Sequence, residues 1–240
     1  MFKEIRMFLG GSTLFSYIMV SPLLPKCVKQ YVQYYVVSYL RFLCNVKVNV
    51  YGNKQLLGGN DIYMANHYEG IDYHVLYPLI TSPYSNQCYS IAKDDMLGKK
   101  YPTTNILTLF EKFIKIFYEG GDLIPYARGD KNSGMRVRNR AVEILNDNNK
   151  LLIFPEGRSW RKGKCVEFKS GMFQVAEQCN KHIVPITLKY RYFDGKNKGE
   201  ACVVQDWMDI EVDVFIHDKV SPKNYEKMLE ETFEKITSKN

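Results

Sequence analysis

The sequence lacks the cysteine spacing of a disulfide-stapled module or a structural zinc site. Its 240 residues include six cysteines, with no CxxC pair among them, and only four histidines. Small secreted domains use a dense cysteine framework, and structural zinc uses closely spaced pairs of cysteine and histidine ligands. The composition therefore predicts reduced thiols and no metal site.

Signatures of nucleic-acid binding are missing as well. There is no run of five basic residues, no zinc-finger spacing and no aromatic RNA-binding motif, so no nucleic-acid partner is expected. The net charge of +7 instead favours an anionic membrane surface or a phosphorylated or CoA-type substrate. With 45 % hydrophobic and 25 % charged residues, the composition is that of a globular protein with one sizeable core.

The amino-terminal segment contains an uncharged apolar stretch, MFLGGSTLFSYIMVSPLL, over residues 7–24. A helix that crosses a bilayer needs about 20 apolar residues and tolerates about 17. Glycine, serine, threonine and proline weaken the stretch, so a true span and a shallow or re-entrant segment both stay open. Its SPLLP ending lacks the small-residue cleavage pattern of a secretory signal. Basic residues flank it on both sides and leave its orientation undecided.

The next segment has the periodicity of an α-helix with one apolar stripe. This stripe either packs against the core or lies in the surface of a bilayer. Residues 1–45 are therefore predicted to form a membrane-associated helical segment, followed by one domain over residues 46–240. The apolar positions of the stripe are Val32, Tyr35, Val36, Tyr39, Leu40 and Leu43.

From residue 46 onward, short apolar strands alternate with helical stretches. This alternation predicts an α/β fold with a mostly parallel central sheet flanked by helices, in which ligands bind at the carboxyl ends of the strands. Three motif-like loops, after Ala65, Ala127 and Phe154, begin at such ends. Strands are expected at 46–50, 61–65, 88–92, 123–127, 151–154, 183–188 and 208–217, and helices at 73–80, 106–118, 133–146 and 171–179.

The first of these loops contains Asn66, His67 and Asp72. In an ideal helix, five residues turn through about 500°, which would place the imidazole and the carboxylate about 140° apart. Gly70 allows a turn in which the carboxylate accepts a hydrogen bond from one ring nitrogen and the other nitrogen serves as a base. No GxSxG-like elbow supplies a protein nucleophile, so the expected nucleophile is a substrate hydroxyl. A structural histidine is the alternative.

The other two loops contribute a carboxylate and two arginines. Glu156 follows a buried strand, and Arg158 lies at the mouth of the predicted site. A planar guanidinium there can bind phosphate oxygens in a bidentate manner. Arg128 occupies the equivalent position after its own strand, and Lys93, just after another strand, is a further phosphate candidate.

These loops carry a resemblance to the glycerolipid and lysophospholipid acyltransferases. NHYEGID at 66–72 resembles the NHxxxxD motif of that family, and GGDLIPYARGD at 120–130 resembles its second motif. FPEGRS at 154–159 resembles the third, FPEGTRS, and IVPITL at 183–188 resembles the fourth. The third motif departs from the family pattern at two positions, because Arg158 stands where the family has threonine and Ser159 where it has arginine.

The resemblance implies a glycerol-3-phosphate acyltransferase-like fold and an acyltransferase catalytic domain over residues 46–240. The expected reaction moves a fatty acyl group from an acyl-CoA or acyl carrier protein thioester to the free hydroxyl of lysophosphatidate, giving phosphatidate. His67 is the expected general base and Asp72 its orienting partner. The residues expected to bind or shape the acceptor and its phosphate are Asn66, Lys93, Arg128, Glu156, Gly157, Arg158 and Ser159.

The same resemblance implies no bound cofactor or metal, since the thioester is a co-substrate. The expected partners are a lysophospholipid, an acyl donor and a bilayer, and the expected location is the endoplasmic reticulum or another intracellular membrane, or a bacterial inner membrane. Three alternatives stay open: remodelling or transacylation of a lysophospholipid with another head group, hydrolysis, and non-catalytic lipid binding by a membrane protein of the same fold.

Overall fold

The computed structural model describes residues 23–68, 71–93, 123–127, 130, 132–158, 166–192 and 209–238, together with nine positions between residues 5 and 20. Within these ranges the side chains of residues 26, 27, 93 and 192 are not described. The helix expected at 106–118 lies outside the described residues.

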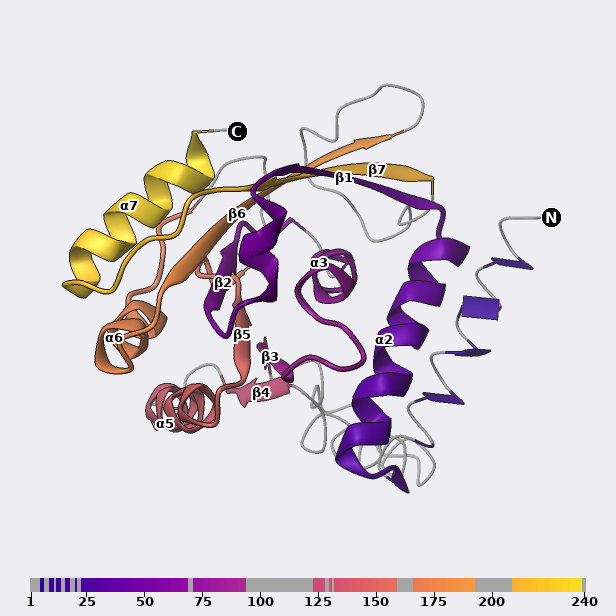
Figure 1. Cartoon of the computed structure of the whole chain (residues 1–240), viewed down its shortest axis with the longest axis horizontal. Coiled ribbons are helices and arrows are strands. Elements are labelled where there is room, and N and C mark those ends of the chain that lie inside the picture. The colour runs from indigo at the N-terminus through magenta and orange to yellow at the C-terminus, as the bar shows by residue number, and fades with distance from the viewer. Residues whose placement is uncertain are drawn as a thin grey trace.

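The described strands form one seven-stranded sheet in the order β1-β7-β6-β2-β5-β3-β4 (Figure 1). Neighbouring strands are parallel except for β6 and β7, which are antiparallel. The predicted mostly parallel sheet is therefore confirmed. The strands are β1 (Val46–Gly52), β2 (Ile62–Ala65), β3 (Cys88–Lys93), β4 (Leu123–Tyr126), β5 (Lys150–Ile153), β6 (Ile183–Tyr192) and β7 (Ile210–Ile216).

Helices cover both faces of the sheet, as Figure 1 shows. On one face α3 (Asp72–Ile80) packs with α2 (Lys26–Leu43) and the short 3-10 helix η2 (Lys54–Gly58). On the other face lie α5 (Ser133–Asn146), α6 (Gly171–Gln178) and α7 (Tyr225–Thr237).

The residues of strand β2 are apolar throughout because the strand is buried on both faces. Tyr63 and Ala65 belong to the core on the α3 side, whereas Ile62 and Met64 belong to the core on the α5 side. Successive strand residues point to opposite faces of a sheet, and a parallel sheet is buried on both. The unbroken apolar run before Asn66 is therefore a central strand, and it fixes the position of the loop that follows.

Helix α2 buries only part of the predicted stripe. Leu43 of the stripe is buried, whereas Tyr35 and Tyr39 are 50 % and 42 % exposed. Gln33 and Val37, which lie outside the stripe, are buried as well. Gln33 can be buried because its amide accepts a hydrogen bond from the Tyr17 hydroxyl and donates one to the Tyr73 hydroxyl.

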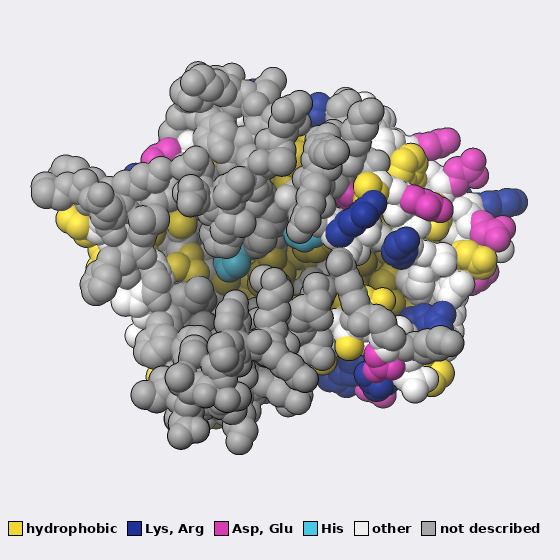
Figure 2. Space-filling view, turned by 180° about the vertical axis from the view of Figure 1, so that it is seen from behind, with side chains coloured by type: hydrophobic (Ala, Val, Ile, Leu, Met, Phe, Trp, Pro, Cys, Tyr) yellow, Lys and Arg dark blue, Asp and Glu magenta, His cyan; other side chains and the backbone are white. Residues whose placement is uncertain are grey.

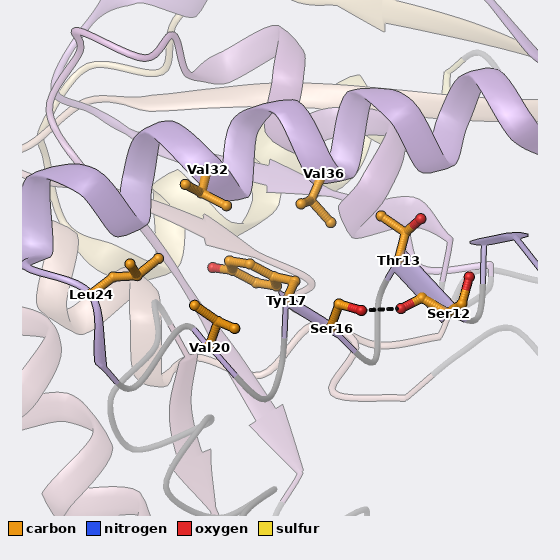
Figure 3. Close-up of a pocket in the computed structure, with 8 residues that line it drawn as sticks. All are labelled: Ser12, Thr13, Ser16, Tyr17, Val20, Leu24, Val32 and Val36. Carbon is orange, nitrogen blue, oxygen red and sulfur yellow. Dashed lines mark hydrogen bonds between the residues drawn. The ribbon is translucent and has the colours of Figure 1, made fainter.

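A cavity of about 410 Å³ lies between the amino-terminal segment and α2 (Figure 3). The hydroxyls of Ser12, Thr13 and Ser16 donate to backbone carbonyls of their own segment, which leaves a largely apolar wall. None of the predicted site residues lines this cavity. Its lining residues are Ser12, Thr13, Ser16, Tyr17, Val20, Leu24, Val32 and Val36. Among the helices that the structure describes, none has the length and hydrophobicity needed to cross a membrane.

Candidate active site

Strand β2 delivers Asn66 and His67 to the carboxyl edge of the sheet. Asn66 is completely buried, and its amide pairs with the backbone of Leu188 in β6. Its Nδ2 donates to the Leu188 carbonyl at 3.0 Å, and its Oδ1 accepts from the Leu188 N–H at 2.7 Å. Both polar atoms of Asn66 are thus used to fasten the end of β2 to β6, a role in holding the loop.

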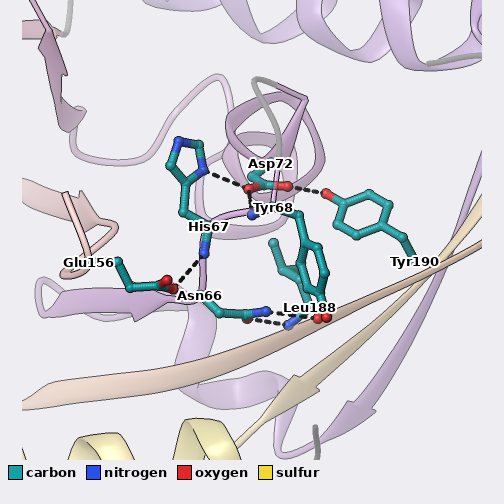
Figure 4. A network of polar contacts seen from close by, with 7 residues as sticks. All are labelled: Asn66, His67, Tyr68, Asp72, Glu156, Leu188 and Tyr190. Atoms are coloured by element: carbon teal, nitrogen blue, oxygen red, sulfur yellow. Dashed lines mark hydrogen bonds and ion pairs between the residues drawn. The ribbon is translucent and has the colours of Figure 1, made fainter. Parts of the chain in front are cut away.

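The predicted contact between His67 and Asp72 is present. Nδ1 of His67 lies 2.7 Å from Oδ2 of Asp72 (Figure 4). Asp72 is the first residue of α3 and is completely buried, and a carboxylate at a helix amino terminus is favoured by the helix dipole. The Tyr68 N–H donates to the same oxygen at 2.7 Å, and the Tyr190 hydroxyl donates to Oδ1. Because the buried carboxylate acts as an acceptor, Nδ1 of His67 is assigned the proton.

The imidazole is held on one edge and on one face. Its ring stacks on Phe154, with centroids 4.5 Å apart and planes inclined by 25°. The second ring nitrogen, Nε2, points away from Asp72 in Figure 4, and the His67 side chain remains 24 % exposed. Histidine side chains are also visible among hydrophobic ones on the face shown in Figure 2. An oriented imidazole with one reachable nitrogen is the geometry of a general base.

Glu156 connects the loop after β2 with the loop after β5. The Glu156 side chain is almost completely buried, and its Oε1 accepts a hydrogen bond from the His67 N–H at 3.0 Å. Its Oε2 accepts from the Val166 N–H at 3.5 Å. Gly157 follows with a φ of +64°, and a β-carbon there would meet only Lys169 at 3.9 Å. The left-handed backbone, rather than lack of space, therefore favours glycine.

The predicted phosphate-binding residues are described only in part. Arg158, in the loop after β5, is exposed. Arg128 and Ser159 lie outside the described residues, and for Lys93 only the backbone is described, at the end of β3. Residue 93 pairs in register with Tyr126 at the end of β4, so the ends of these two strands are adjacent. Among the described residues no group of three or more His, Cys, Asp or Glu side chains is placed to hold a metal ion.

Two side chains of the network escaped the sequence analysis. Phe154 enters the sequence analysis as the end of an apolar run and the start of FPEGRS, without a role of its own. Tyr190 lies 118 residues from Asp72, in a strand expected to end at 188. A signal for Tyr190 does exist, since a tyrosine in a buried strand needs a partner for its hydroxyl. That signal does not say which residue the partner is.

Comparisons with known proteins identify the family to which the chain belongs. A family model described as Acyltransferase matches residues 47–189, which is more than half of the chain. The chain is 26 % identical over 145 residues to the chloroplastic 1-acyl-sn-glycerol-3-phosphate acyltransferase LPAT1 of Arabidopsis thaliana, covering 59 % of this chain and 36 % of that protein. It is 32 % identical over 66 residues to the chloroplastic 1-acyl-sn-glycerol-3-phosphate acyltransferase BAT2 of Brassica napus, covering 28 % of this chain and 19 % of that protein.

The chain thus spans about a third or less of the length of these two relatives. The crystal structure of the 1-acyl-sn-glycerophosphate acyltransferase PlsC from Thermotoga maritima superposes with a TM-score of 0.64 at 17 % identity, covering 100 % of this chain and 96 % of that one. This similarity confirms the predicted fold class. With the family match over residues 47–189, the resemblance seen in the motifs is confirmed, and the chain belongs to the Acyltransferase family.

Proposed function

We propose that this protein is an O-acyltransferase that moves a fatty acyl group from an acyl thioester to the free hydroxyl of lysophosphatidate. The observation that carries this proposal is the pairing of His67 with the buried carboxylate of Asp72 at 2.7 Å, while the imidazole stays 24 % exposed. Family membership supports acyl transfer as the reaction. The names of the two plant relatives support lysophosphatidate as the acceptor.

In the proposed reaction, Nε2 of His67 removes the proton from the acceptor hydroxyl as its oxygen attacks the thioester carbonyl carbon. The new C–O ester bond forms, the C–S bond breaks, and the thiolate of the donor leaves. The imidazolium then gives its proton to this thiolate, which restores neutral His67 and releases a thiol. Asp72 keeps the proton on Nδ1 and stabilises the imidazolium. General-base help of this kind contributes about 10²- to 10⁴-fold in rate.

The remaining site residues take supporting roles in this proposal. Glu156 and Gly157 shape the acceptor site through the backbone of the two loops, Arg128 and Arg158 bind the phosphate of the acceptor, and Lys93 and Ser159 are further candidates for binding it. The donor is acyl-CoA or an acyl carrier protein thioester, and no bound cofactor takes part.

Residues 1–45 form the membrane-associated segment of the proposed enzyme. Helix α2 carries an exposed aromatic stripe, defined here as Tyr31, Tyr35, Tyr39 and Phe42, with exposed fractions of 43 %, 50 %, 42 % and 77 %. The spacing of these four residues places them along one side of the helix. Aromatic side chains favour the head-group region of a bilayer, and helices that lie in the interface bury such a side. This supports a membrane location for an enzyme whose acceptor and product partition into lipid.

The reaction is tested by thioester-dependent acylation of lysophosphatidate in membranes that contain the protein. Phosphatidate formation is expected with the wild type and is expected to fall at least about 10²-fold with His67→Ala. His182→Ala is the matched control, since His182 also faces an aspartate, Asp61, but at 3.9 Å and with 45 % of its side chain exposed. Wild-type membranes that acylate no lysolipid from a panel of head groups would overturn the proposal.

The membrane contact is tested by co-sedimentation with vesicles of phosphatidylcholine and phosphatidylglycerol. Tyr35→Ser combined with Phe42→Ser removes two members of the aromatic stripe and is expected to weaken binding about tenfold or more. The control combines Tyr51→Ser with Met135→Ser, two side chains of similar exposure on β1 and α5. Equal loss in both double variants would mean that α2 is not the membrane-facing element.

A further inference from the structure

The buried carboxylate of Asp72 accepts hydrogen bonds from two parts of the chain, the loop after β2 and strand β6. Oδ2 accepts from the imidazole of His67 and from the backbone N–H of Tyr68, and Oδ1 accepts from the Tyr190 hydroxyl (Figure 4). A fully buried charge is costly unless hydrogen bonds compensate for its lost hydration. The proposed mechanism uses the donor from His67, and the Tyr68 donor comes from the backbone of the same loop. The Tyr190 hydroxyl is the side-chain donor that comes from a distant strand.

Tyr190 is itself firmly placed. It is 8 % exposed within the core on the α3 side, and its ring packs edge-on against Tyr68 with centroids 5.4 Å apart. It lies two residues beyond Leu188 in β6, so the two residues project on the same side of the strand. Leu188 fastens Asn66 at the start of the loop, and Tyr190 fastens Asp72 at its end. Strand β6 therefore holds both ends of the segment that carries His67.

We propose that Tyr190 is a positioning residue for the His67–Asp72 pair, a role that rests on the proposed acyltransferase function. Rotation about the terminal torsion of an aspartate is only weakly restricted, and a donor on Oδ1 fixes the plane in which Oδ2 faces Nδ1. The Tyr190 hydroxyl thereby sets the direction in which Asp72 holds the imidazole. Tyr190 acts through Asp72, and its burial keeps it away from the substrate.

Tyr190→Phe is the variant that tests this role, since it removes the hydroxyl and keeps the ring against Tyr68. We expect kcat for lysophosphatidate acylation to fall about ten- to a hundredfold, the usual effect of losing a group that orients a functional residue. KM should change less than twofold, because the acceptor and donor contacts are untouched.

Tyr63→Phe is the matched control. Tyr63 is a completely buried tyrosine of the same sheet, and its hydroxyl donates to the Gly59 carbonyl at 2.8 Å, with the Leu56 carbonyl 3.2 Å away. The two variants lose the same atom, each from a buried tyrosine. A fall in kcat with Tyr190→Phe alone supports the proposal, and equal falls in both variants would overturn it.

A second measurement reports on the hydrogen bond without using the reaction. In protein labelled with ¹⁵N-histidine, the Nδ1 proton of His67 should give a low-field resonance, assigned by its loss in His67→Ala. Tyr190→Phe is expected to shift or broaden this resonance, and Tyr63→Phe should leave it unchanged. An unmoved resonance together with unchanged kcat would overturn the role of Tyr190. If Tyr190→Phe shifts the resonance but the wild-type protein acylates no lysolipid, the proposed function would be overturned and the positioning role would stand.

Discussion

A buried charged group lies at each end of helix α3, and the two ends differ in what surrounds that charge. At its first residue, on the carboxyl edge of the sheet, Asp72 meets an imidazole that is 24 % exposed. At its last residue, on the opposite edge, the Ile80 carbonyl accepts a hydrogen bond at 2.8 Å from Lys150, which is only 1 % exposed. Both contacts match the helix dipole, with an anion at the amino terminus and a cation at the carboxyl terminus.

The difference lies in whether a reactive atom is left within reach. Lys150 is enclosed, and burial lowers the pKa of its ammonium group, with Cys88 and Asp61 acting in the opposite direction. Asp72 is equally enclosed but holds an imidazole whose other nitrogen is reachable. A buried charge with a perturbed pKa is often taken as a sign of function. Here the ammonium closes a helix end, whereas the carboxylate orients a candidate base.

The sharpest way to break this comparison is to neutralise one aspartate at each edge. Asp72→Asn is expected to lower the rate of lysophosphatidate acylation about 10²- to 10⁴-fold, because an amide N–H facing Nδ1 would keep the imidazole proton on Nε2, the wrong nitrogen. Asp61→Asn is the control. Asp61 is 7 % exposed and pairs with Lys219 at 2.6 Å. Initial rates at saturating substrates measure the effect, and similar rates in the two variants would contradict the assignment of the carboxyl edge as the site.

A smaller effect is expected at the other end of α3. Lys150→Met removes the donor to the Ile80 carbonyl, which should lower the free energy of unfolding by about 1–3 kcal/mol. The substitution also removes the cost of burying an ammonium group, which partly offsets this loss. The rate of acylation by the folded protein should stay within twofold of the wild type. Urea titration followed by circular dichroism measures stability, and a variant of full stability but low activity would reverse the comparison.

Contacts between residues close together in the sequence were predictable, whereas contacts between distant segments were not. The contact between His67 and Asp72 spans five residues, and the turn that joins them was inferred from residue types in one loop. The strands before the motif loops were found because a parallel sheet demands unbroken apolar runs. The order of the strands along the sheet was not predicted, since it depends on pairings between distant segments.

Three features were not predicted from the sequence, for the same physical reason. Tyr190 meets Asp72 across 118 residues, and periodicity says nothing about such a partner. Gln33 seemed to lie off the apolar stripe of α2, yet it is buried because Tyr17 and Tyr73 bind both ends of its amide. The strand predicted at 151–154 excludes Lys150, although β5 begins with this residue and the Ile80 carbonyl accepts its hydrogen bond. A polar side chain can be buried where the fold supplies a hydrogen-bond partner for it, and in these three cases that partner comes from a distant part of the sequence.

The smallest expected effect is a pH dependence of stability at the Lys150 end. Because the pKa of Lys150 is lowered in the folded protein, the unfolded chain binds more protons between that lowered value and about 10.4, the ordinary pKa of lysine. Stability contributed by this group therefore rises with pH in that window and is constant below it, with a slope of at most about 1.4 kcal/mol per pH unit.

Burial also raises the pKa of Tyr63, which makes stability fall again above pH of about 10. The difference in unfolding free energy between wild type and Lys150→Met cancels the tyrosine contribution, so it should grow in favour of the wild type from neutral pH to pH 10. A flat difference across urea titrations in this range would mean that the ammonium of Lys150 carries no burial penalty.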